Sequence, residues 1–262
     1  AARTALIRHC EEHFGSKIFM YNLIGGVSCE WQGWGAHHLA DWKKLADYSP
    51  HALRDFKAFA KEYQVETTAI PSYQERTHSA DGLFRDPRTD ARSMLYDVYY
   101  SHSIASCINE LAAAAKEACH RSKLIGAYYG YHFEYQNMQY CINSAGHNAL
   151  AEVLASPDVD FLMSPQSYGV RAVGYPMEDM KPFGSIWNNG KISFMEDDPR
   201  THLTKPADFS QAINLKQTRA VLQRNWGVML TRRTPLFLFP INEGSDHDHP
   251  MIRQDLEYAR RI

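Results

Sequence analysis

Short apolar runs rich in β-forming residues alternate along this chain with longer amphipathic segments. Five runs have the length and composition of strands, at 17–26, 123–131, 159–165, 191–197 and 235–241. Helical patterns occupy the stretches between and after them, at 51–63, 91–121, 147–155, 207–225 and 251–261. Such alternation predicts an α/β fold with parallel strands, because each helix returns the chain to the start of the next strand.

The number of strand–helix units narrows the architecture that we expect. The length of 262 residues falls in the range of a (β/α)₈ TIM barrel, which needs eight units, whereas the pattern supplies five. We expect one catalytic domain over 1–262 that covers about strands four to eight. Roughly 90 to 120 residues that form the first three units would then precede Ala1, and whether they include a signal peptide is left open. A smaller open sheet is the alternative.

Composition and charge restrict the partners. The chain is 44% hydrophobic and 22% charged, with a formal net charge of −2 and without Lys/Arg runs. This balance predicts no nucleic acid and no membrane as partners, and favours a neutral substrate. Five cysteines without CxxC spacing predict neither a disulfide framework nor structural zinc. Localisation and self-association into a homo-oligomer are left open.

Polar and aromatic residues follow the ends of four predicted strands, whereas the strand bodies are apolar. In a parallel α/β barrel the working residues come from these strand ends, and a mixture of acids and aromatic rings suits a sugar site. We therefore expect these positions to bind substrate: Trp31, Trp34, Tyr131, Glu134, Gln166, Tyr168, Arg171 and Asp198.

Two glutamates are the candidate catalytic residues, because hydrolysis of a glycosidic bond needs two carboxyl groups on opposite faces of the anomeric carbon. Glu30 follows a Gly-Gly turn beside Trp31, an apolar neighbour that is expected to raise its pKa, as a general acid requires. Glu196 ends an apolar strand and precedes Asp197 and Asp198. The alternatives are a surface glutamate in a loop and a solvated acidic turn, respectively.

Six motifs are spread along the chain. They are GG-x-S-x-EW at 25–31, DYSP at 47–50, FRDP at 84–87, GAYYGY at 126–131, GHNALAEVLASPDVDFLMSPQSY at 146–168, and GK-x-x-x-x-E-x-D-x-RT at 190–201. Together they resemble glycoside hydrolase clan A, and most closely its family 42 β-galactosidases and their uncharacterised relatives. The resemblance runs from about residue 10 to about residue 240, and its most specific part is the block from 146 to 201.

The resemblance implies roles for both glutamates. In that clan the acid/base ends the fourth strand and the nucleophile ends the seventh, which are the places of Glu30 and Glu196. A tyrosine after strand six that hydrogen-bonds the nucleophile would be Tyr168. One departure is Cys29, which stands where the clan usually has an asparagine that holds the substrate's 2-hydroxyl.

The function expected from these residues is retaining hydrolysis of β-glycosides, similar to that of a β-galactosidase, in plant or microbial oligosaccharides or polysaccharides. The reaction proceeds by double displacement without cofactor or metal. Glu134 is the main rival to Glu30. The alternatives are a β-mannosidase or β-glucanase of the same clan, a non-catalytic carbohydrate-binding barrel, and a metal-dependent hydrolase that uses the HFE (132–134) or DHDHP (246–250) segment.

Overall fold

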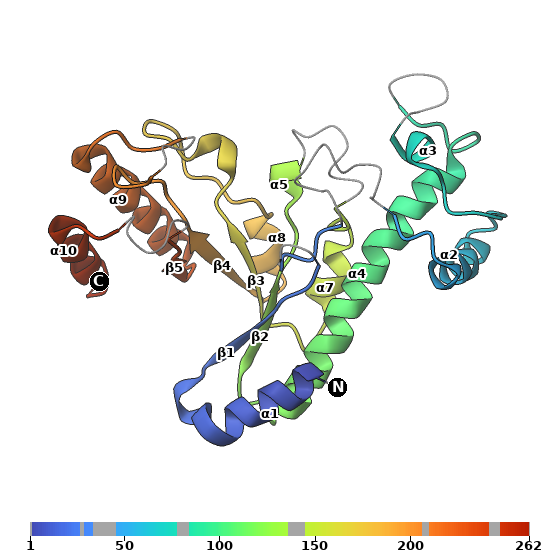
Figure 1. Ribbon diagram of the computed structural model, residues 1–262, viewed down its shortest axis with the longest axis horizontal. Coiled ribbons are helices and arrows are strands. Elements are labelled where there is room, and N and C mark those ends of the chain that lie inside the picture. The colour runs from blue at the N-terminus through green and yellow to red at the C-terminus, as the bar shows by residue number, and fades with distance from the viewer. Residues whose placement is uncertain are drawn as a thin grey trace. The chain divides into compact units, whose positions relative to one another are not determined.

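The computed structural model describes residues 2–26, 29–33, 46–77, 84–135, 145–205, 210–240 and 247–261. Its five strands follow one another across the sheet in chain order (Figure 1). The contacts divide the chain into two compact units, Ala1–Phe161 and Leu162–Ile262. The strands are β1 (Met20–Leu23), β2 (Leu124–Tyr128), β3 (Phe161–Pro165), β4 (Ile192–Asp197) and β5 (Leu236–Leu238).

The long helix α4 (Ala91–Ala118) is the centre of the first unit. It contacts α1, α2, α3, α7 and both strands of the unit, β1 and β2, which pair in parallel (Figure 1). A core cluster forms where α2 meets α4, with the ring of Phe56 edge-on to that of Tyr96. The other helices of this unit are α1 (Ala2–Phe14), α2 (Pro50–Glu62), α3 (Tyr73–Thr77), α5 (His132–Tyr135) and α7 (Leu150–Ala155), and the 3₁₀ turn η1 is Gly15–Lys17.

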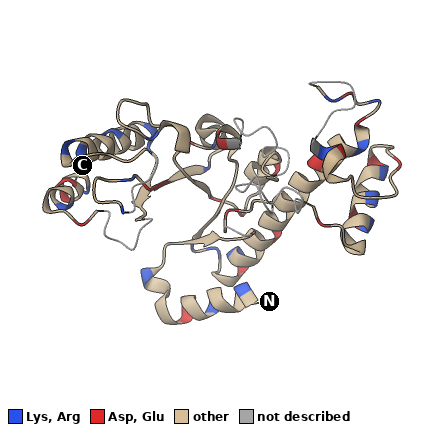
Figure 2. Cartoon of the chain, turned by 45° about the horizontal axis from the view of Figure 1, so that its top comes forward, with Lys and Arg blue, Asp and Glu red and all other residues tan. Residues whose placement is uncertain are grey.

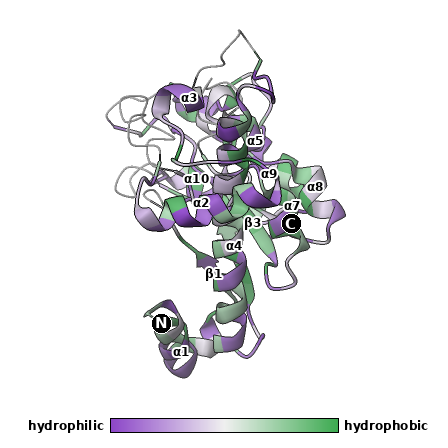
Figure 3. Ribbon diagram, turned by 90° about the vertical axis from the view of Figure 1, so that its right-hand side faces the viewer, coloured by the Kyte–Doolittle hydropathy of each residue, from purple (hydrophilic) through white to green (hydrophobic). Residues whose placement is uncertain are grey.

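The second unit is built around β4, which pairs in parallel with β5. All five residues of β3 are buried, in keeping with the hydrophobic colour of that strand in Figure 3. One core cluster joins Met195 of β4 to Met229 of α9, and another joins Trp226 of α9 to Ile252 of α10. The helices are α8 (Phe183–Asn188), α9 (Leu215–Arg232) and α10 (Pro250–Ala259), and the 3₁₀ turn η3 is Tyr168–Val170.

The predicted alternation of strands and helices is confirmed, since each observed strand lies within its predicted range. The start of α2 also agrees with the sequence, because Ser49 accepts a hydrogen bond from the amide of Ala52 at 3.2 Å and Pro50 opens the helix. The eight-unit barrel and the single domain stay predictions.

Two predicted helices have the wrong bounds. The helix expected at 207–225 begins at Leu215, because Asn214 caps its first turn by accepting from the amide of Gln217, and it runs on to Arg232. The helix expected from residue 147 begins at Leu150, and residues 147–149 are not helical.

Residues of both charge signs occur along α2 and α4, whereas the charged residues of α9 are all basic (Figure 2). None of the helices that the structure describes has the length and apolar character needed to cross a membrane.

Candidate functional site

Glu30 lies in a tight loop directly after β1. The amide of Gly25 donates to the carbonyl of Cys29 at 3.3 Å, and the amide of Trp31 donates to the carbonyl of Gly25 at 2.9 Å. Cys29 and Trp31 have φ angles of 67° and 59°, in the left-handed region that residues with a side chain seldom adopt. Such strain persists where the surrounding contacts enforce it, and it is concentrated at functional sites.

Both carboxylate oxygens of Glu30 accept hydrogen bonds. The hydroxyl of Tyr131 donates to Oε1 at 3.0 Å, and the side-chain amide of Gln32 donates to Oε2 at 3.0 Å. Tyr131 and Gln32 are buried, whereas Glu30 itself is half-buried. The carboxylate is therefore held from its buried side and keeps access to solvent.

The imidazole ring of His147 contacts the backbone of the same loop. Its Nδ1 accepts hydrogen bonds from the amides of Gly130 and Tyr131, both at 3.1 Å, and its Nε2 lies 3.1 Å from the carbonyl oxygen of Glu30. The ring is buried between those of Tyr129 and Tyr131, with centroids 4.6 Å and 4.9 Å away. Glu30, Gln32, Tyr131 and His147 are called the Glu30 cluster below.

Trp31, expected to stack on a sugar, packs inside the first unit. It is 6% exposed, and its indole N–H donates to the carbonyl of Leu23 at 2.7 Å. A Cβ atom added to Gly25 would lie 2.7 Å from the ring, so this glycine is what allows the ring to approach. These contacts favour a packing role for Trp31. The other predicted tryptophan, Trp34, lies outside the described residues.

The rival acid, Glu134, lies in the one-turn helix α5 that follows Tyr131. Its side chain is half-buried. Its neighbour in the HFE segment, His132, contacts the carbonyl of Gly130 through Nδ1 at 2.9 Å. Glu134 therefore lies close in sequence to the Glu30 cluster and stays a candidate for substrate contact.

In the second unit, Glu196 lies near the end of β4 and is half-buried, while the next residue, Asp197, is completely buried. Oδ1 of Asp197 accepts hydrogen bonds from the side-chain amides of Gln166 and, at 2.8 Å, Asn225. Burial raises the pKa of Asp197 to about 7, and the charge of Asp198 adds to that rise while the hydrogen bond from Asn225 opposes it. A carboxyl group in this setting favours its protonated form.

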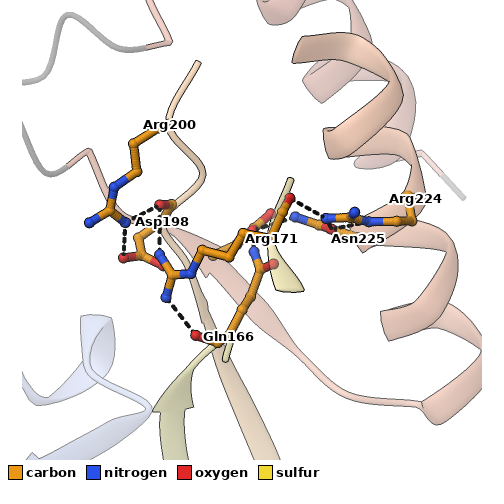
Figure 4. A network of polar contacts seen from close by, with 7 residues as sticks. Gln166, Arg171, Asp198, Arg200, Arg224 and Asn225 are labelled. Carbon is orange, nitrogen blue, oxygen red and sulfur yellow. Dashed lines mark hydrogen bonds and ion pairs between the residues drawn. The ribbon is translucent and has the colours of Figure 1, made fainter. Parts of the chain in front are cut away.

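Asp198 is the centre of an ion-pair network between buried side chains. Nη1 of Arg171 lies 2.6 Å from its Oδ1, and Nη1 of Arg200 lies 2.9 Å from its Oδ2 (Figure 4). The guanidinium group of Arg171 lies over the ring of Tyr168 with its central carbon 3.9 Å from the centroid, and also donates to the carbonyl of Gln166. Arg171 and Asp198, which were expected to contact sugar, thus brace the segment beside Glu196.

A second buried ion pair contacts β3 through the hydroxyl of Ser164. The ammonium group of Lys181 is completely buried, 2.8 Å from Oδ1 of Asp179 and 2.9 Å from the hydroxyl of Ser164. Burial lowers the pKa of Lys181, and the neighbouring carboxylate opposes that effect. The backbone of Asp179 also forms an antiparallel β-bridge with that of Gln166, so the Lys181–Asp179 ion pair helps to fix the segment that carries Gln166.

The proposed metal-ligating segment DHDHP has structural roles in its described part. His249 caps α10 by accepting from the amide of Met251 at 3.2 Å, and Asp248 forms an ion pair with Arg253. Asp246 lies outside the described residues. Within the part of the chain that the structure describes, no group of three or more His, Cys, Asp or Glu residues is arranged to hold a metal ion.

Comparison with solved structures shows the fold. The chain is similar to the catalytic domain of a β-amylase from Paenibacillus polymyxa, with a TM-score of 0.65 and 16% sequence identity. The similarity covers 99% of this chain and 68% of that chain. No family model matches the sequence, and no curated protein is similar to it. At this identity the likeness supports the α/β fold and says nothing about substrate.

Three polar residues of these sites were not predicted from the sequence. Gln32 lies two positions after Glu30 and had no motif of its own. His147 stands alone in the sequence, away from the predicted strand ends, and it joins the Glu30 loop to the end of β2. Asn225 had no signal either, because it stands at the end of the helix expected at 207–225, where asparagine is common, whereas the observed helix runs on to Arg232.

Proposed function

We propose that this protein is a retaining β-glycoside hydrolase, similar to a β-galactosidase, in which Glu196 is the nucleophile and Glu30 the acid/base. The observation that carries the proposal is the arrangement of Glu30 in the loop after β1, where Tyr131 and Gln32 hold one carboxylate oxygen each. The shared fold with the catalytic domain of a β-amylase, a glycoside hydrolase, supports the class of reaction.

The reaction follows double displacement. Glu196 attacks the anomeric carbon while the protonated Glu30 gives its proton to the departing oxygen, so that the glycosidic bond breaks as a glycosyl ester forms. Glu30 then takes a proton from water, which attacks the same carbon and releases Glu196. Two carboxyl groups that work in this way stand about 5 to 5.5 Å apart, whereas inverting enzymes hold theirs about 6.5 to 9.5 Å apart.

The segment around Glu196 suits a nucleophile that has to stay in one position. Asp197 and Asp198 on its C-terminal side are both buried and hydrogen-bonded, so the end of β4 is fixed by side chains of β4 itself, of the β3–α8 segment and of α9. A catalytic group held within about 0.5 Å of its working place in this way needs little rearrangement during the reaction.

Hydrolysis of nitrophenyl β-galactoside, β-mannoside and β-glucoside tests the proposal, with the matching α-glycosides as controls. We expect one or more β-glycosides to be cleaved, and Glu30→Gln and Glu196→Gln each to lower kcat by at least about 10³-fold, because each removes an essential proton donor or nucleophile. Glu178→Gln, at an exposed position of the second unit, is the matched control and should retain activity.

Two outcomes would contradict the proposal. Absence of cleavage of all three β-glycosides would favour the non-catalytic carbohydrate-binding alternative, which the exposed Cys29 at the usual place of asparagine keeps open. Activity that survives Glu30→Gln but is lost in Glu134→Gln would transfer the acid/base role to the rival residue.

A further inference from the structure

His147 connects two parts of the first unit that are far apart in the sequence. It lies in the non-helical segment before α7, is 1% exposed, and contacts the end of β2 through one ring nitrogen and the Glu30 loop through the other. The preceding Gly146 has a φ of +80°, and its carbonyl accepts from the hydroxyl of Tyr129 at 2.9 Å. The backbone that carries the imidazole is therefore itself fixed.

The surroundings select one tautomer of this histidine. The amides of Gly130 and Tyr131 both point their hydrogens at Nδ1, so Nδ1 has to offer its lone pair. The carbonyl oxygen of Glu30 can only accept, so Nε2 has to carry the hydrogen. The neutral Nε2–H form satisfies all three groups. In the imidazolium or in the Nδ1–H tautomer, Nδ1 would carry a hydrogen that faces the hydrogens of both amides.

The segment at the end of β2 is hydrogen-bonded to the carboxylate of Glu30 directly and to its backbone through His147. His147 fixes the Glu30 carbonyl to the amides of Gly130 and Tyr131, and Tyr131 also donates its hydroxyl to the Glu30 carboxylate. Because the residues on both sides of Glu30 have left-handed backbone conformations, the loop needs such an external support to keep its shape.

We propose that His147 is a positioning residue for Glu30: through its Nε2–H tautomer it fixes the backbone of the acid/base to the end of β2. Its contribution to function rests on the role proposed for Glu30 above, whereas its structural contribution does not depend on any activity. Removing the support should leave substrate binding largely intact and misplace the proton donor, and misplacement of about 1 Å can cost about 10²-fold in rate.

Two substitutions separate the two sides of the imidazole. His147→Asn places an amide oxygen near the position of Nδ1, so it can still accept from the amides of Gly130 and Tyr131 but has no group that reaches Glu30. His147→Gln places its amide near the position of Nε2, so it can still donate to the Glu30 carbonyl. His102→Asn is the matched control, since His102 is partly exposed and contacts Glu152 instead.

The structural arm uses spectroscopy and hydrogen exchange on the full chain. We expect ¹⁵N shifts at pH 7 to show a neutral Nε2–H imidazole at His147. We also expect the amide of Trp31 to exchange at least about tenfold faster in His147→Asn than in the wild type, in His147→Gln or in His102→Asn. An imidazolium, an Nδ1–H tautomer, or equal exchange in all four proteins would overturn the proposal.

The kinetic arm measures hydrolysis of the best aryl β-glycoside. We expect His147→Asn to lower kcat by about 10- to 100-fold with little change in KM, and His147→Gln to recover most of the loss. Equal kcat in the Asn and Gln variants would refute the positioning role even if the wild type is an active glycosidase. A wild type without activity would refute the proposed function alone, because the spectroscopic arm still decides the contact.

Discussion

The buried carboxyl group of Asp197 provides the most quantitative prediction, through the substitution Asp197→Asn. Asparagine keeps an oxygen that can accept from Gln166 and Asn225, and it removes the ionisable group. Its new amide hydrogens face the place of Oδ2, for which the described residues provide no hydrogen-bond partner. Below about pH 7 the protonated carboxyl group of the wild type also carries its hydrogen at that place, so the wild type and the variant share this mismatch, and the comparison isolates the part of the stability that depends on ionisation.

The pH dependence follows from the raised pKa. In the native state the pKa of Asp197 is about 7, against an ordinary value of 3.8. Between these values the native protein holds a proton that the unfolded chain has released, so the free energy of unfolding falls as the pH rises. A tenfold change in proton affinity corresponds to about 1.4 kcal/mol, so a pKa higher by about three corresponds to about 4 kcal/mol. The whole of that stability is present below about pH 4 and is lost above about pH 7.

Urea unfolding of both proteins from pH 4 to pH 9 measures this contribution. We expect the unfolding free energy of the wild type minus that of Asp197→Asn to fall by about 4 kcal/mol as the pH rises to about 8, and then to level off. Asp55→Asn, at an exposed position, should show no such fall. A difference that is constant with pH, or that rises with it, would mean that Asp197 is ionised in the native protein and is held by its arginine neighbours, and would refute the reasoning.

Two further predictions concern stability. Lys181→Met should lower the free energy of unfolding by about 3 to 5 kcal/mol, because it leaves the charge of Asp179 buried without its partner. Adding Asp179→Leu should recover much of that loss in urea unfolding, and equal instability of the single and double variants would contradict this. Gly25→Ala should lower the free energy of unfolding by about 1 to 3 kcal/mol and change the fluorescence of Trp31, because the new methyl group would lie 2.7 Å from the indole ring. Gly184→Ala is the control and should do neither, because its methyl group meets nothing within 4 Å.

The strands could be predicted because their signals are local. Runs rich in apolar and aromatic residues with a Gly or Pro nearby mark each strand, and Glu196 lies within β4, whereas Glu30 lies seven positions past Leu23, the last residue of β1. The helix starts were less predictable, because the start of α9 depends on the side chain of Asn214 turning back to cap the first turn.

The support of Glu30 could not be predicted, because it depends on contacts between distant segments. His147 and Glu30 are 117 positions apart, and Tyr131 and Glu30 are 101 apart, so no local pattern joins them. The left-handed conformations of Cys29 and Trp31 leave no trace in residue type, since neither is a glycine. Tertiary hydrogen bonds decide both features.

The most direct test of the central claim is covalent trapping with activated 2-deoxy-2-fluoro-β-glycosides, followed by mass spectrometry of peptides. The fluorine slows both chemical steps, and the activated leaving group lets the first proceed, so a retaining enzyme accumulates its glycosyl ester. We predict one sugar per chain, attached to Glu196, and no labelling of Glu196→Gln. Attachment at another residue, or no adduct in a protein that hydrolyses the parent glycoside, would contradict the assignment of the nucleophile and the retaining mechanism.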